Sequence, residues 1–242
     1  MQQHDHSEKV VDPLRIGGIQ PCTLIDYPGK LACVIFTQGC VLRCKYCHNP
    51  ELVEPKLFTN CIPEERVWAF LQKRVGQLEG VVISGGEPTL QRGLIPFIEE
   101  VKDLGYLVKL DTCGYFPEVV SYLLDHHLID YIAMDMKAPL DTYQKVTQVN
   151  TNVQRIKKSI ALILSATIPY EFRTTVIKEL LSKNDLLQIA QEIRGAQQYY
   201  IQKFRPNTIL LPELNQSHNY SDTEFEDILH MIQPFVVHCA VR

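Results

Sequence analysis

The sequence contains no apolar run long enough to cross a membrane. Its most apolar stretches, residues 31–36 and 160–168, are far shorter than the roughly 20 residues that a membrane-spanning helix needs. The N-terminal segment MQQHDHSEKVVDP lacks the apolar core of a signal peptide and the Arg-rich, acid-poor composition of a transit peptide. We therefore expect a cytoplasmic protein with no membrane partner. Residues 1–20 are expected to form a flexible lead-in and residues 21–242 a single domain.

A basic excess is also missing. The chain has 24 Lys and Arg against 28 Asp and Glu, a net charge of -4, so it offers no electrostatic footprint for a nucleic acid. It also lacks the Gly-x4-Gly-Lys phosphate loop, the Gly-x-Gly-x2-Gly dinucleotide fingerprint and the His-Glu-x2-His zinc motif. The function must therefore be sought in other motifs.

Short β-rich runs alternate with segments of helical periodicity along most of the chain. Six such βα units predict an α/β fold, in which parallel strands are joined by right-handed crossovers into a sheet that is open or curled toward a barrel. In such folds ligands collect at the carboxyl ends of the strands. Strands are expected over residues 31–38, 80–84, 106–111, 131–135, 171–176 and 199–204, helices over 63–78, 94–104, 118–127, 153–165 and 184–194, and surface loops over 182–185 and 207–221.

Three of the eight cysteines lie within eight residues, in GCVLRCKYCHNP directly after the first expected strand. Soft thiolates select zinc, copper(I) or iron-sulfur clusters. Structural zinc normally takes four protein ligands, and His48 is the only nearby fourth candidate. A [4Fe-4S] cluster held by Cys40, Cys44 and Cys47 alone would leave one iron open to an external ligand. The spacing favours a cluster, with zinc or a thioredoxin-like use of Cys44 and Cys47 as the alternatives.

Cys-x3-Cys-x2-Cys with an aromatic residue, Tyr46, before the last cysteine resembles the radical S-adenosylmethionine (SAM) enzymes. The resemblance covers nearly the whole chain and implies a single-domain partial (β/α)6 barrel. In that family the open iron binds S-adenosylmethionine, and one electron from the cluster splits it into methionine and a 5'-deoxyadenosyl radical that abstracts hydrogen. It implies a [4Fe-4S] cluster and S-adenosylmethionine as cofactors, with Tyr46 and His48 beside them.

Two motifs after later strands extend the resemblance. Ser84-Gly85-Gly86-Glu87 is similar to the family motif whose backbone binds the methionyl amino group, although alone it would be read as a tight turn. Asp111-Thr112-Cys113-Gly114 resembles the Asp-Thr-Asn-Gly of glycyl radical enzyme activases, with Cys113 in place of Asn. A thiol hydrogen-bonds more weakly than an amide, which puts any contact of that Asn in question. Cys113 is read as a small buried filler, with a reactive thiol near the cluster as the alternative.

The remaining site residues follow the last three parallel strands. Asp135 and Lys137 are similar to the Asp-x-Lys of the same activases, and Lys137 could bind the cofactor's carboxylate. Arg173 offers a second cation, either for that carboxylate or for a structural ion pair. Gln202 falls where similar proteins contribute to the adenosine pocket.

The combination of IGGIQPCTLIDYPGK, GCVLRCKYCHNPEL, ISGGEP, LDTCG and MDMK is most similar to the activating proteins of anaerobic ribonucleoside-triphosphate reductase. The resemblance implies removal of a hydrogen atom from a glycine of that reductase, with flavodoxin or ferredoxin as electron donor. The alternatives are an activase of pyruvate formate-lyase or another glycyl radical enzyme, a small-molecule radical SAM enzyme, and a non-catalytic metal-binding regulator.

Overall fold

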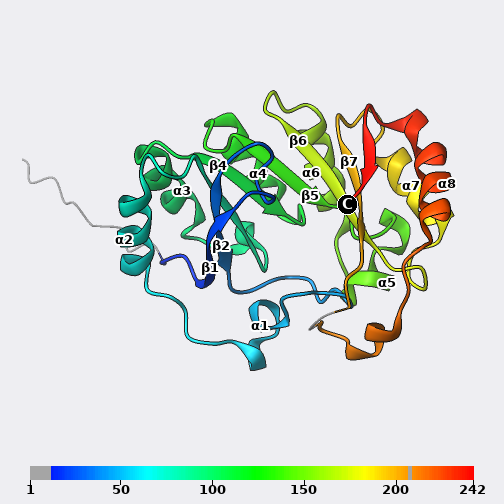
Figure 1. Ribbon diagram of the computed structural model, residues 1–242, viewed down its shortest axis with the longest axis horizontal. Coiled ribbons are helices and arrows are strands. Elements are labelled where there is room, and N and C mark those ends of the chain that lie inside the picture. Colours follow the sequence, from blue (N-terminus) through cyan, green and yellow to red (C-terminus); the bar gives the residue numbers. More distant parts are fainter. Residues whose placement is uncertain (1–11, 207–208) are drawn as a thin grey trace, which may run out of the picture.

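The computed structural model describes residues 12–206 and 209–242, which form one curved eight-stranded sheet with helices on its outer side (Figure 1). The strands follow one another in chain order from β1 to β8, and every neighbouring pair from β2 to β8 is parallel, whereas β1 runs antiparallel to β2. The sheet is open, with β1 and β8 at its edges, as expected for a partial barrel. The strands are β1 Ile16–Thr23, β2 Ala32–Thr37, β3 Gly80–Gly85, β4 Leu107–Thr112, β5 Tyr131–Asp135, β6 Tyr170–Val176, β7 Tyr199–Lys203 and β8 Cys239–Val241.

Helices connect the parallel strands in the order that the sequence predicts. In Figure 1, α2 and α3 cover one end of the sheet and α7 and α8 the other. The helices are α1 Pro50–Val53, α2 Glu64–Arg74, α3 Leu94–Asp103, α4 Pro117–Asp125, α5 Gln144–Thr147, α6 Val153–Leu164, α7 Lys183–Glu192 and α8 Asp222–Ile232. None of the described helices is both long and apolar enough to cross a membrane.

The two faces of the sheet differ in chemistry, because side chains alternate between the faces along a strand. On β4, Val108 and Leu110 belong to the large apolar core beneath the helices, whereas Lys109 and Asp111 form an ion pair on the other face. The inner face therefore combines a small apolar cluster, which contains Tyr131, with a layer of charged residues. This layer lies next to the candidate site.

The structure differs from the sequence-based expectations mainly at the two edges of the sheet. Strand β1 takes up residues 16–20 of the expected lead-in, and Leu14 is already buried, so the ordered fold begins before residue 21; residues 1–11 lie outside the described residues. Strand β8 and helix α8 follow the last expected strand. Ser182, expected in a loop, is the N-cap of α7.

Candidate active site

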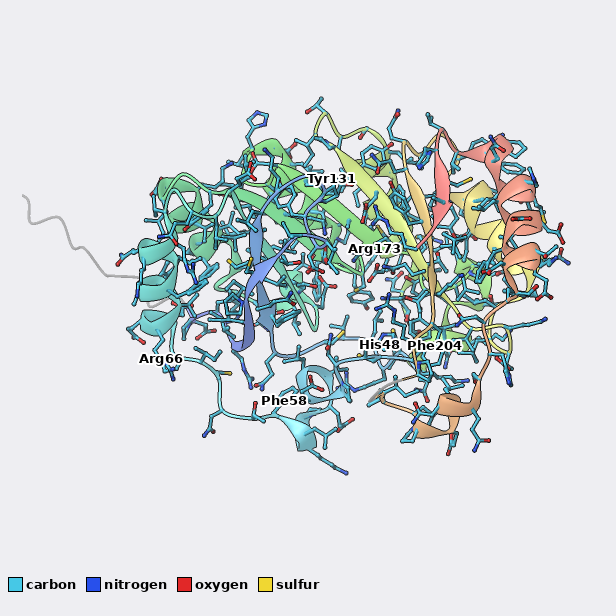
Figure 2. The ribbon with its side chains drawn as sticks, viewed as in Figure 1. His48, Phe58, Arg66, Tyr131, Arg173 and Phe204 are labelled. Carbon is cyan, nitrogen blue, oxygen red and sulfur yellow. The ribbon has the colours of Figure 1, made fainter. Side chains whose placement is uncertain are left out.

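A cavity of about 390 Å³ lies where the cysteine loop meets the carboxyl ends of the parallel strands. Of all the site residues that the sequence predicts, only Glu87 is absent from its wall. In the view of Figure 2, Arg173 on β6 lies between Tyr131 above it and His48 below it. The predicted residues that line the cavity are Cys40, Cys44, Tyr46, Cys47, His48, Ser84, Gly85, Gly86, Asp111, Thr112, Asp135, Lys137, Arg173 and Gln202.

The cysteine loop is held by backbone hydrogen bonds to two distant segments. The amides of Arg43 and Lys45 donate to the carbonyls of Thr147 and Val146, at 3.0 and 3.1 Å. The carbonyl of Cys47 accepts from Leu210 N at 3.0 Å, and Leu211 N donates to Lys45 at 3.1 Å. The conformation of the loop therefore depends on contacts that are remote in sequence.

The three thiols line one cavity without forming a site for a single ion. Within the described part of the chain, no three His, Cys, Asp or Glu side chains are placed to hold one metal ion. Burial raises the pKa of Cys44 to about 11 and that of Cys40 to about 12, so metal binding must displace thiol protons at neutral pH.

Tyr46 lines the same cavity beside these thiols. Its side chain is buried, and its hydroxyl has no hydrogen-bond partner among the described residues. Buried polar groups in native proteins are nearly always paired. An unpaired hydroxyl on the wall of this cavity therefore fits a polar ligand inside it.

The paired glycines at the end of β3 allow a close backbone approach. A Cβ on Gly86 would lie 2.1 Å from the carbonyl oxygen of Gly39, and a Cβ on Gly85 would lie 2.4 Å from the backbone nitrogen of Thr37. Gly85 also has a φ of 110°, in the region that favours glycine. The glycines thus seat the strand end directly against the start of the cysteine loop.

Glu87 lies outside the cavity wall, and its carboxylate is hydrogen-bonded within the protein. Its carboxylate is fully buried and accepts hydrogen bonds from the hydroxyls of Thr89 and Thr112 and from the Cys113 amide, the last two at 2.7 Å. It therefore joins the ends of β3 and β4 behind the cavity. Cys113 is buried against Leu42 and Cys44, in agreement with its expected role as a filler.

Arg173 forms the structural ion pairs that the sequence left as an alternative. Its Nε donates to Asp135 Oδ1 at 2.8 Å and its Nη1 to Asp111 Oδ2 at 3.3 Å. Lys137 Nζ adds a 2.9 Å bond to Asp135 Oδ2, and Lys109 Nζ binds Asp111. Arg173 also lies 3.9 Å from Glu171 Oε1, so cations and carboxylates alternate across the ends of β4, β5 and β6 in one buried ion-pair network.

Neighbouring charges keep this network ionised despite its burial. Burial alone would raise the pKa of Asp111, but Arg173 and Lys109 outweigh it and lower that pKa. Burial would likewise raise the pKa of Asp135, which Arg173 and Lys137 hold well below its usual range. Burial would lower the pKa of Lys137, yet Asp135 raises it. At neutral pH the cavity therefore presents fixed charges.

A second, outer cavity of about 1090 Å³ adjoins the first. Its wall adds residues from the β1–β2 connection, from β7 and from the position after β8, among them Ile25, Lys203 and Arg242. Asn49 and Thr175 belong to both cavities and were not predicted, although Thr175 could have been found, since it lies two residues beyond Arg173 on the same strand. The cavities share Asp26, His48, Asn49, Arg173, Thr175 and Gln202.

The fold and its site define an open α/β barrel of the kind found in radical SAM proteins. Streptococcus suis SuiB bound to S-adenosylmethionine matches with a TM-score of 0.64 at 12% identity, over 86% of this chain and 51% of that one. QueE from Escherichia coli matches with a TM-score of 0.56 at 15% identity, over 95% and 93% of the two chains. At these identities the likeness concerns the fold alone.

The sequence comparisons place the chain more narrowly. Residues 34–193 match the family model of the radical SAM superfamily. A Methanocaldococcus jannaschii protein named as a glycyl-radical enzyme activating enzyme is 30% identical over 94% of this chain and 95% of its own. The pyruvate formate-lyase-activating enzyme of Clostridium pasteurianum is 36% identical over 51% of this chain and 52% of its own. The chain belongs to the radical SAM superfamily and, within it, to the glycyl-radical enzyme activating enzymes.

Members of this superfamily are enzymes that use a [4Fe-4S] cluster and S-adenosylmethionine. The residues present fit both groups. Three thiols share one cavity, the buried Tyr46 hydroxyl has no hydrogen-bond partner among the described residues, and the cations Lys137 and Arg173 lie on the same wall. The structure therefore has the donors that such a cofactor pair requires.

Proposed function

We propose that this activase acts on anaerobic ribonucleoside-triphosphate reductase and removes a hydrogen atom from one of its glycines to leave a stored glycyl radical. The observation that carries the proposal is the motif set TLIDYPGK, GCVLRCKYCHNPEL, LDTCG and MDMK, which is most similar to the activators of that reductase. All four motifs contribute residues to the wall of one cavity, as a single reaction centre requires.

Within this proposal the three cysteines hold the cluster and leave one iron open. Cys40, Cys44 and Cys47 supply thiolates, and the loop that carries them is fixed by its bonds to residues 146–147 and 210–211. When bound, the cluster and S-adenosylmethionine supply the electron and the radical that take the glycine hydrogen. Flavodoxin or ferredoxin is the proposed electron donor. All eight cysteines are free thiols, which supports a reducing, cytoplasmic location.

The cofactor's polar groups would be held by the remaining residues of the wall. Lys137 and Arg173 carry the positive charge that binds a carboxylate, and Asp135 and Asp111 fix the direction of both cations. Tyr46 has a free hydroxyl for a polar group. The other residues of the proposed cofactor-binding wall are His48, Ser84, Gly85, Gly86, Thr112 and Gln202. Glu87 acts indirectly, because its carboxylate holds the ends of β3 and β4 together.

Activation of pyruvate formate-lyase is the second candidate, because several relatives carry that activity in their names. The enzymes of Clostridium pasteurianum and Streptococcus mutans are 36% and 32% identical over about half of this chain. Those matches end within the chain, whereas the match to the unspecified activating enzyme extends over 94% of it. The relatives therefore support the assignment to the glycyl-radical enzyme activases. Which glycyl radical enzyme is activated has to be decided by experiment.

The test uses anaerobically reconstituted protein, reduced with dithionite and supplied with S-adenosylmethionine and either reductase or pyruvate formate-lyase. We expect an electron paramagnetic resonance doublet of a glycyl radical with the reductase and no doublet with the lyase. A doublet with the lyase alone would replace the proposed target with the second candidate. Absence of 5'-deoxyadenosine would contradict the cofactor chemistry itself.

The same assay tests the ligand assignment. Cys44→Ala should lose both the visible absorption of the cluster and the production of 5'-deoxyadenosine, because two thiolates remain in the cavity. Cys239→Ala is the matched control, since Cys239 lies on β8, outside the cavity wall, and should lose neither. Full retention of both signals in Cys44→Ala would exclude Cys44 as a ligand.

A further inference from the structure

Two adjacent aliphatic side chains are held in solvent at the connection between β1 and β2. Leu24 is 75% exposed and Ile25 is 85% exposed, the highest values among the large hydrophobic residues that the structure describes. Single exposed apolar residues are common, but neighbouring ones at the rim of a cavity mark interaction sites. Leu24 and Ile25 are therefore a candidate contact surface for another molecule.

The connection that carries the pair is fixed on both sides. The Thr23 hydroxyl accepts from the amides of Ile25 and Asp26 at 3.2 and 3.3 Å. Tyr27 is buried, with its ring 5.9 Å from that of Tyr131 in an edge-to-face arrangement. The chain between Thr23 and Tyr27 therefore holds the two side chains outward and could bind with little loss of conformational entropy.

One member of the pair, Ile25, also lies on the wall of the outer cavity. Ile25 lines the outer cavity together with Asp26 and Pro28, and Asp26 belongs to the inner cavity as well. Because the two cavities share six wall residues, the outer one gives a protein segment a way to bring a glycine to the inner one. The surface of the same protein around that segment would then rest against the rim.

We propose that Leu24 and Ile25 dock the target protein, by inserting into an apolar depression beside the glycine-bearing segment of the glycyl radical enzyme. This inference rests on the proposed function in requiring a protein substrate, and it adds the surface that recognises it. A small substrate held in the inner cavity would gain nothing from side chains that project into solvent. Paired aliphatic anchors at a cavity rim are suited to a protein surface, where a few buried side chains carry most of the binding energy.

The test compares Leu24→Ser/Ile25→Ser with the wild type in glycyl radical formation at varied target concentration. We expect the KM for the target protein to rise about tenfold, which corresponds to about 1.4 kcal/mol. Cluster absorption and the slow formation of 5'-deoxyadenosine without target should be unchanged, because neither residue lies on the inner wall. The double variant Leu24→Met/Ile25→Met, which keeps both positions apolar, should retain the KM within about twofold.

Val237→Ser is the matched control, since Val237 is 68% exposed, precedes β8 and lines neither of the two cavities. An equal KM for Leu24→Ser/Ile25→Ser and Val237→Ser would overturn the docking proposal. Each variant is assayed with whichever enzyme the wild type activates. Activation of pyruvate formate-lyase alone would overturn the proposed target and still test the rim, whereas activation of neither enzyme would overturn both.

Discussion

At the scale of single residues, the most unusual feature is a lysine inside the sheet. Lys109 is 1% exposed, and its ammonium group binds Asp111, which in turn contacts Arg173 and Ser84. A buried charge is tolerated only when it is paired. Lys109 and Arg173 therefore both pair with Asp111, and of these two cations only Arg173 also lines the cavity.

Lys109→Met should lower the free energy of unfolding by about 3 kcal/mol, because it leaves Asp111 with one fewer cation in a buried site. Lys102→Met is the control. The Lys102–Asp130 pair is also a close contact, at 2.8 Å, but its side chains are 27% and 28% exposed, so its loss should cost about 0–1 kcal/mol. Denaturant titration of both variants measures the difference. Equal losses of unfolding free energy would show that the buried Lys109–Asp111 pair stabilises the fold no more than the exposed pair does.

The sequence predicted the identity of the cavity-lining residues better than their roles. Fourteen of the fifteen predicted positions line the cavity, because motifs that follow parallel strands must gather at one edge of the sheet. Glu87 is the exception, and nothing in the local sequence indicates that its carboxylate turns back toward Thr112 and Cys113. Arg173 was left open because an ion pair with Asp111 and Asp135 depends on strand order, which a linear motif does not contain.

At the scale of elements, the end of β3 is fitted to the cysteine loop by the absence of a side chain. Gly86→Ala would place a Cβ 2.1 Å from the Gly39 carbonyl oxygen, so the strand end or the loop must move. We expect a loss of about 1–3 kcal/mol of stability together with reduced cluster incorporation. Both are measured on the reconstituted protein by denaturant titration and visible absorption.

Gly18→Ala provides the matched control for this substitution. A Cβ there would meet Phe36 at 3.6 Å, an ordinary contact, and Gly18 has no positive φ. Alanine should therefore be neutral or slightly stabilising within β1. If Gly86→Ala behaved like Gly18→Ala, the close approach of β3 to the loop would not limit the fold.

Helix α8 begins with a reciprocal cap whose strength depends on pH. Glu224 Oε2 accepts from Ser221 N at 2.8 Å, and Oε1 accepts from Lys178 Nζ at 2.6 Å. The hydrogen bond from Lys178 and then that from Ser221 lower the pKa of Glu224 from 4.5 to about 2. A lowered folded-state pKa gives stability that is present above pH 4.5 and is lost as pH falls toward 2.

Glu224→Gln should therefore be less stable than the wild type at pH 7, by a difference that stays constant down to about pH 5. The difference should shrink below pH 4.5, as the wild-type carboxyl takes up its proton in the unfolded state. Thermal unfolding of the two proteins between pH 7 and pH 3.5 measures it. A difference that grew on acidification would contradict the lowered pKa.

The inner elements were predictable and the edge elements were not, for a physical reason. Strands buried on both faces read as continuous apolar runs, and β5 was predicted at its observed bounds, Tyr131–Asp135. Strand β1 contains Gly17, Gly18 and a proline, which weaken the strand pattern, and β8 has only three residues. Helix α8 did carry a readable signal, since Ser221 and Glu224 have the spacing of a capping box.

At the scale of the whole molecule, the cysteine loop is bonded to segments that lie far from it in the sequence. The loop follows β2, yet its backbone is bonded to Val146 and Thr147 after β5 and to Leu210 and Leu211 after β7. In Figure 1 the segments around α1 and α5 lie on the same side of the sheet. Any group that fixes the loop therefore also restrains segments that are more than a hundred residues away.

Loading of the cluster should accordingly slow amide hydrogen exchange beyond the loop itself. The amides of Leu210 and Leu211 donate to the carbonyls of Cys47 and Lys45, and a ligand that binds only the folded loop suppresses the openings that release them. We expect exchange at these two amides to be at least about tenfold slower in the reconstituted protein than after chelation of the iron. The Phe97 amide on α3, which donates to Gly93 at 3.1 Å, should exchange at the same rate in both states. Equal protection of Leu210 and Leu211 with and without iron would mean that the loop keeps its shape without the cluster, and that the fold alone prepares the site.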